Sequence, residues 1–158
     1  MNNPAYCWAP RGMRPGVQVQ RVREYTYVYS ALSPQDGELF SLILPYADTD
    51  RMELFLDELA KRLGGGPALI VMDQAAWHKA ATLMEKHPNI LVAYQPPYSP
   101  ELNPVEHLWK HLRQNHMKNH YSESMDDLED SLQSALKDCA QERETMRSLA
   151  AFNWMKGL

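Results

Sequence analysis

Two short apolar runs constrain the fold of this chain more than any other feature. The segment Ala68–Met72 (ALIVM) contains no polar side chain, and Ile90–Tyr94 (ILVAY) has the same character. Continuous runs of this length are typical of strands buried on both faces, as in a parallel sheet. Parallel neighbours need a long crossover connection, for which we expect a helix over residues 77–86. The pattern therefore predicts an α/β fold.

The N-terminal part of the chain predicts a loop followed by a β-hairpin. Residues 1–20 are rich in proline and glycine and show no apolar period, which indicates an extended loop. Residues 23–33 and 38–44 are rich in aromatic and β-branched side chains. The sequence PQDG at residues 34–37 lies between them and is typical of a turn, so we expect two antiparallel strands.

Amphipathic helices are expected around these strands. Asp50 with Glu53 has the spacing of a capping box, and apolar residues at helical spacing follow until the glycines at 64–66. A further helix is expected to begin near Asn103, and the periodicity of residues 121–158 predicts C-terminal helices. The expected order is β-β-α-β-α-β-α, followed by these helices.

Composition and charge limit the classes of function. The 158 residues suit one domain, with 44% apolar and 23% charged residues as in globular proteins. No apolar run approaches the roughly 20 residues that span a bilayer, so we expect no membrane partner and a cytoplasmic location. The net charge of -4 argues against sequence-independent binding of polyanions, which depends on Lys and Arg.

The cysteines and histidines do not predict a zinc site. Cys7 and Cys139 lie far apart and outside any Cys-x-x-Cys motif, so we expect reduced packing residues rather than a disulfide or a Cys-based zinc site. Two histidine pairs have the i,i+4 spacing that zinc can use: His107 with His111, and His116 with His120. Neither pair has a third ligand or a catalytic glutamate between its members.

Two carboxylates at element boundaries are the strongest candidates for chemistry. Asp73 ends the first apolar run, and Glu106 follows the turn sequence PPYSPELNP at residues 96–104. Together they could hold hard divalent cations through oxygen ligands. Both also have structural interpretations. Asp73 suits the N-cap of the next helix, and Glu106 suits the third position of a helix capped by Asn103, with Lys110 as its i,i+4 partner.

Basic and aromatic side chains near these acids are candidates for DNA contact. His78 follows Asp73 and could orient water or phosphate. Three further candidates follow Glu106: Lys110, Arg113 and Lys118. The tyrosines at positions 25, 27 and 29 alternate onto one face of the first strand, where they could stack on bases, although core packing is the preferred interpretation.

Read together, two segments resemble a known catalytic core. Residues 71–78 (VMDQAAWH) and 96–109 (PPYSPELNPVEHLW) resemble bacterial insertion-sequence transposases related to the mariner superfamily, in their DDE endonuclease domain. The similarity extends to residues 7–10 (CWAP), to residues 23–45 and to the C-terminal helices. It covers nearly all of residues 1–158 as a single domain.

The resemblance implies a ribonuclease H-like fold, in which helices flank a mixed sheet. An acidic triad would bind two Mg²⁺ or Mn²⁺ ions, with Asp73 as its second acid and Glu106 as its third, in preference to Glu101. The family's first acid lies on a central strand upstream of the segment that matches Cys7. We therefore expect a partial domain without that strand, for which Asp48 and Asp50 are weak substitutes.

The implied function is the C-terminal catalytic portion of a DDE transposase, which cleaves DNA and transfers strands. Expected partners are transposon ends, target DNA, and an upstream reading-frame product or full-length transposase. We expect the protein to dimerise when the site is complete and to associate with the nucleoid when it is bound to DNA. The chain could instead be a non-catalytic remnant that binds DNA or transposase. A cellular nuclease acting on RNA-containing duplexes would fit the chemistry but not the motifs.

Overall fold

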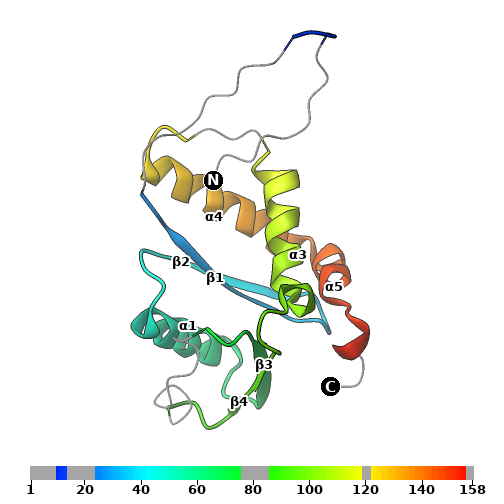
Figure 1. Cartoon of the computed structure of the whole chain (residues 1–158). Helices are drawn as coiled ribbons and strands as arrows, with labels where there is room; N and C mark the ends of the chain where they lie inside the picture. The colour runs from blue at the N-terminus through cyan, green and yellow to red at the C-terminus, as the bar shows by residue number, and fades with distance from the viewer. Residues whose placement is uncertain (1–9, 14–23, 76–85, 119–121, 156–158) are drawn as a thin grey trace.

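The chain folds as a mixed α/β protein in which helices surround two small sheets. A computed structural model describes residues 10–13, 24–75, 86–118 and 122–155 (Figure 1). The expected helix over residues 77–86 and most of the expected N-terminal loop lie outside these ranges. In chain order the elements are β1 (Tyr27–Leu32), β2 (Leu39–Leu44), α1 (Thr49–Arg62), β3 (Ala68–Met72), β4 (Ile90–Tyr94), the 3-10 turn η2 (Pro100–Leu102), α3 (Pro104–His111), the π-helical turn η3 (Leu112–His116), α4 (Met125–Gln141), α5 (Arg143–Ala150) and the 3-10 turn η4 (Asn153–Met155).

The hairpin predicted at the N-terminal end is confirmed. Strands β1 and β2 pair antiparallel, from Tyr27 opposite Leu44 to Leu32 opposite Leu39. Gly37 in the connecting turn has φ of 70°, a conformation that favours glycine, and its N–H donates to the carbonyl of Ser33 over 3.0 Å. The turn chemistry read from the sequence therefore forms as expected.

The hairpin lies between α1 on one side and α3, α4 and α5 on the other (Figure 1). Its side chains alternate between the two faces and join a separate hydrophobic cluster on each. One face packs against α3, α4 and α5 through Val28, Leu32, Leu39 and Ile43. The other face packs against α1 through Tyr29, Ala31, Phe40 and Leu42. Of the three alternating tyrosines, only Tyr29 reaches a core, whereas Tyr25 is 69% exposed. Core packing was therefore the correct interpretation for one of the three.

The N-cap of helix α1 is Asp48, two residues before the predicted Asp50. The carboxylate of Asp48 accepts a hydrogen bond from the N–H of Arg51 over 2.9 Å, and Asp48 has extended backbone geometry. The prediction of Asp50 as N-cap was wrong, because both aspartates suit the position and only Asp48 has that contact. The predicted apolar face is confirmed: Phe55 stacks on Phe40, with ring centroids 5.4 Å apart.

Strands β3 and β4 form a parallel pair, as predicted. The register runs from Ala68 opposite Ile90 to Met72 opposite Tyr94. One face packs against α1, but the paired residues Leu69 and Leu91 on the other face are 48% and 69% exposed. The expectation of burial on both faces was therefore wrong for this pair.

The two strand pairs are separate sheets within the described residues. Helix α1 nevertheless connects them, because its buried side chains contact the hairpin and also Ile70, Met72 and Val92 of the parallel pair. Both pairs therefore present one face to the same helix.

The C-terminal helices predicted from periodicity are present. Ser124 caps α4 by accepting from the N–H of Asp127 over 3.1 Å. Leu136 and Cys139 of α4 and Met146 of α5 join Leu108 and Leu112 in the larger core. None of the helices in the described ranges has the length and apolar character needed to cross a bilayer.

Candidate functional site

Asp73 lies directly after β3, where the strand leaves the sheet. Its side chain is exposed, and Oδ1 accepts a hydrogen bond from the N–H of Ala75 over 2.9 Å. This bond is an Asx turn, which fixes the direction in which the chain leaves the strand. The Asx turn accounts for one oxygen of Asp73, and the helix that Asp73 was predicted to cap lies outside the described residues.

Gln95 connects the strand end that carries Asp73 with the turn that precedes α3. It is only 4% exposed. Its backbone N–H donates to the carbonyl of Met72, and its side-chain Nε2 donates to the carbonyl of Leu102, both over 2.9 Å. The sequence reasoning missed this residue, although a polar side chain directly after an apolar run is a usable signal. Through its backbone N–H and its side-chain amide, Gln95 therefore links the strand end that carries Asp73 to the turn before the helix that carries Glu106.

Glu106 lies in the first turn of α3 and is exposed. Asn103 caps the helix as predicted, since its side chain accepts from the N–H of Val105 over 3.1 Å, and Pro104 occupies the first position. The N–H of Asn103 donates to Pro100 rather than to Glu106, so the capping box does not form. Within the described residues, the carboxylate of Glu106 has neither a hydrogen bond nor an ion pair, with Lys110 or otherwise.

The other acids considered from the sequence are Asp48, Asp50 and Glu101. Asp48 is occupied as the cap of α1 and also contacts the guanidinium of Arg51 over 3.4 Å. Asp50 and Glu101 are exposed. Among the described side chains, neither Asp73 nor Glu106 belongs to a group of three or more His, Cys, Asp or Glu residues close enough to share one ion.

The three basic candidates that follow Glu106 lie on, or directly after, the helical segment formed by α3 and η3. Lys110 is in α3, Arg113 is in η3 and Lys118 follows η3, and all three are exposed. Glu106, Lys110 and Arg113 have i, i+4, i+7 spacing, which places them along one side of a helix. His78 lies outside the described residues.

Comparison with known proteins identifies the family. The sequence profile of the DDE superfamily endonucleases matches residues 1–129, well over half of the chain. The chain belongs to this family. It is also 36% identical over 77 residues to the uncharacterized protein y4pE/y4sA of Sinorhizobium fredii (strain NBRC 101917 / NGR234). That match covers 48% of the chain and 56% of the relative, so the chain spans little more than half of the relative's length.

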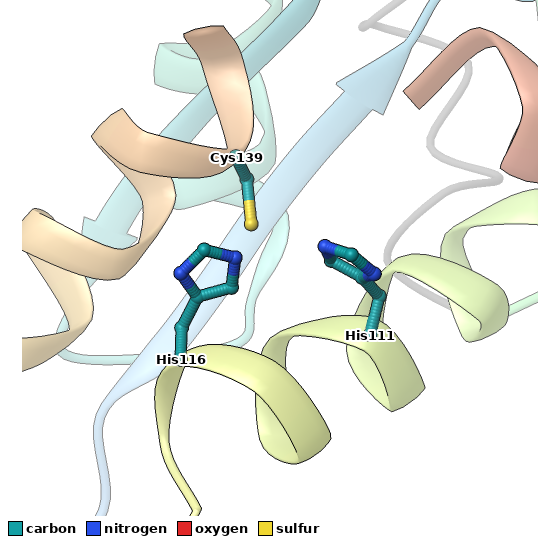
Figure 2. Close-up of side chains that lie close together, drawn as sticks. All are labelled: His111, His116 and Cys139. Atoms are coloured by element: carbon teal, nitrogen blue, oxygen red, sulfur yellow. The ribbon is translucent and has the colours of Figure 1, made fainter. Parts of the chain in front are cut away.

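A cluster of metal-type ligands lies away from the two acids in this DDE endonuclease chain. One ligand atom each of His111, His116 and Cys139 lies within 4.8 Å of the others, and Figure 2 shows the Cys139 sulfur directed toward the two rings. Cys139 is on α4, beyond the part of the chain that matches the family. From the sequence we considered only the i,i+4 pairs and missed this grouping, which joins His111 to His116 and adds Cys139 from another helix.

The π-helical turn η3 creates this pairing. The N–H of Met117 donates to the carbonyl of Leu112 over 3.0 Å, an i to i+5 bond. In a regular α-helix, side chains five residues apart would point about 140° away from each other. The wider turn brings His116 back to the side of His111, and the ring centroids lie 5.4 Å apart.

Polar groups surround the cluster. Glu142, between α4 and α5, lies 3.2 Å from Nε2 of His111 and 3.4 Å from Nε2 of His116. The side-chain amide of Asn115 lies 2.9 Å from Nδ1 of His111. Burial, and secondarily the charges of Glu142 and Asp138, raise the pKa of the Cys139 thiol to about 11. The predicted packing role of Cys139 is confirmed by its complete burial.

Proposed function

We propose that this chain is the C-terminal catalytic portion of an insertion-sequence DDE transposase of the mariner-related kind. It would take part in metal-dependent cleavage of DNA and in strand transfer. The observation that carries the proposal is the link through Gln95, which ties the strand end bearing Asp73 to the helix start bearing Glu106. Both acids lie within the part of the chain that matches the endonuclease family.

The two acids fit hard divalent cations. Endonucleases of this superfamily generally use divalent metals. Asp73 and Glu106 offer exposed carboxylate oxygens, which Mg²⁺ and Mn²⁺ prefer, and the Glu106 carboxylate is not occupied by another described residue. A pair of bound ions would activate the attacking water or DNA 3′-hydroxyl and stabilise the leaving oxygen at the phosphodiester.

The protein's own side chains would position the substrate. Gln95 ties the turn before α3 to the end of β3, which would keep the two carboxylates on neighbouring segments. Three exposed cations beyond Glu106 would contact the DNA phosphates: Lys110, Arg113 and Lys118. His78, five residues after Asp73 in the sequence, would orient water or phosphate.

The site needs a first acid, which we place on a strand from an upstream segment outside these 158 residues. Helix α1 packs against the hairpin and the parallel pair with one face, as it would against a continuous sheet. A strand between the two pairs would complete the expected ribonuclease H-like sheet. Such a segment would come from an upstream reading-frame product or full-length transposase, and the completed protein would dimerise and act on nucleoid DNA in the cytoplasm.

Cation titration tests the ligand assignment. Calorimetry of the full chain with Mg²⁺ and Mn²⁺ should detect binding that is lost in Asp73→Asn and in Glu106→Gln. The matched control is Glu101→Gln, which removes an exposed acid from the neighbouring turn and should leave binding unchanged. Binding that depends on Glu101 instead of Glu106 would show that the wrong acid was chosen. Failure of the unaltered chain to bind either ion would favour the non-catalytic remnant.

A cleavage assay tests the dependence on an upstream segment. A protein that includes this chain and its upstream sequence should nick element-end DNA with Mg²⁺, whereas the 158-residue chain alone should not. Strand transfer by the isolated chain would contradict the proposed dependence.

A further inference from the structure

We propose that His111, His116, Cys139 and Glu142 form a structural zinc site that fastens the end of α3 to α4. This site is separate from the proposed catalytic acids and does not depend on the proposed function. His111 and His116 lie within the family match, whereas Cys139 and Glu142 lie beyond residue 129. The four proposed zinc ligands therefore come both from the segment that matches the family and from the segment that follows it.

The donor set suits zinc and not magnesium. Thiolate sulfur and imidazole nitrogen are borderline or soft ligands that bind Zn²⁺, whereas Mg²⁺ requires oxygen. In a tetrahedral zinc site each donor lies about 2.0–2.3 Å from the ion, so two donors lie about 3.3–3.8 Å apart. The donor atoms of His111, His116 and Cys139 lie within 4.8 Å of one another, and side-chain rotations that move each atom by about 1 Å would bring them to that spacing.

A buried nitrogen without a hydrogen bond supports a ligand at this position. Nε2 of His116 is inaccessible to water and has no hydrogen-bond partner in the described structure. Glu142 lies 3.4 Å away, but the geometry is not that of a hydrogen bond. Buried polar atoms normally have partners, and a coordinated ion would satisfy this one.

Glu142 would complete the coordination shell after a side-chain rotation, because its oxygens are not among the donor atoms that lie within 4.8 Å of one another. Its carboxylate faces both imidazoles, at 3.2 Å from His111 and 3.4 Å from His116, and would supply the fourth donor. Four protein ligands leave no open position, which is typical of structural rather than catalytic zinc. The ion would join the π-helical turn to the junction of α4 and α5.

Asn115 would orient His111 in the complex. Its amide lies 2.9 Å from Nδ1, the ring nitrogen that does not face Glu142. With the amide oxygen turned toward that nitrogen, Asn115 would accept from Nδ1–H and leave Nε2 free for the metal. Most zinc-bound histidines have such an outer partner.

Cobalt spectroscopy of the full chain tests the site, because Co²⁺ replaces Zn²⁺ and its thiolate complexes absorb in the near ultraviolet. The unaltered chain should bind one equivalent of Co²⁺ with thiolate charge-transfer and tetrahedral ligand-field bands, and Zn²⁺ should displace it. Cys139→Ser should abolish the charge-transfer band. The matched control Cys7→Ser removes the other cysteine of the sequence and should leave the band unchanged.

Two further variants keep the test decisive if Cys139→Ser fails to fold. His116→Gln and Glu142→Gln should each weaken Zn²⁺ binding at least about tenfold, whereas His107→Gln, an exposed histidine on α3, should not. The proposal is overturned if the unaltered chain shows no thiolate band, if the band depends on Cys7, or if His116→Gln binds Zn²⁺ as tightly as His107→Gln does.

Discussion

The two ends of helix α3 carry opposite kinds of candidate ligand. Glu106, in the first turn, presents an exposed carboxylate, and its proposed partner Asp73 is also exposed. His111, in the last turn, joins His116 and the fully buried Cys139. One end therefore offers hard oxygen donors open to solvent, and the other offers nitrogen and sulfur donors inside the protein.

This difference separates a site that must admit a substrate from one that need not. Two exposed acids leave coordination positions for water and DNA oxygens, as phosphodiester chemistry requires. The buried cluster, with Glu142 as its fourth donor, would close its own shell. Helix α3 would then be held at one end by a structural ion and present a catalytic ligand at the other.

The largest expected effect separates these two roles. In a protein that includes the upstream segment, Glu106→Gln should lower the rate of metal-dependent cleavage on the order of 10³-fold, because a metal ligand supports several kcal/mol of transition-state charge stabilisation. Thermal unfolding should change little, since the carboxylate is exposed and unpaired among the described residues. Glu142→Gln should show the reverse pattern, a lower unfolding temperature with zinc and cleavage within a few-fold. Equal loss of cleavage in both variants would contradict the separation.

Gly37→Ala should damage the buried end of α3 and spare the exposed end. A Cβ on Gly37 would lie 2.0 Å from the carbonyl oxygen of Arg143, the residue after Glu142. With the strain of a positive φ, the cost should be about 3 kcal/mol in the free energy of unfolding, measured in urea. Zinc affinity should fall with it.

Gly65→Ala is the matched control for this substitution. Gly65 also has a positive φ, of 77°, but a Cβ there would meet no atom within 4 Å. Gly65→Ala should lower the free energy of unfolding by only about 1–2 kcal/mol and leave zinc binding unchanged. Equal destabilisation by the two substitutions would mean that the contact with Arg143 is not important.

The sequence predicted those site residues whose neighbours along the chain mark them, and it missed those that depend on contacts between distant segments. Asp73 directly follows an apolar run, and Glu106 follows a helix-capping turn. The structure places Asp73 at the end of β3 and Glu106 in the first turn of α3, as those local signals predicted. The cap of α1 was placed wrongly because Asp48 and Asp50 have the same local chemistry.

The histidine and cysteine cluster could not be predicted from local spacing. Regular helical geometry pairs residues three or four apart, whereas the π-helical turn pairs His111 with His116. Cys139 reaches them only through packing of α4 against η3. Gln95 was missed for a similar reason, since its partner Leu102 is fixed by the fold of the turn.

A smaller effect is expected for the outer partner of His111. Asn115→Ala should weaken zinc binding about 10- to 100-fold by releasing the orientation of the imidazole, with Mg²⁺ binding unchanged. Competition with a chelating dye measures the first quantity and calorimetry the second. Gln114→Ala, an exposed neighbour in the same turn, should alter neither. Comparable losses for both ions would mean that α3 responds as a whole and that its ends are not independent.

The smallest expected effect concerns DNA contact along the exposed side of α3. Lys110→Gln and Arg113→Gln should each reduce the slope of log affinity against log salt by about 0.9, one released counterion per lost phosphate contact. Fluorescence anisotropy with duplex DNA across a salt series gives the slope. Lys137→Gln, an equal charge change on α4, should leave it unchanged. If all three variants lower the slope equally, binding follows net charge alone, and the side of α3 that bears Glu106 does not face the DNA.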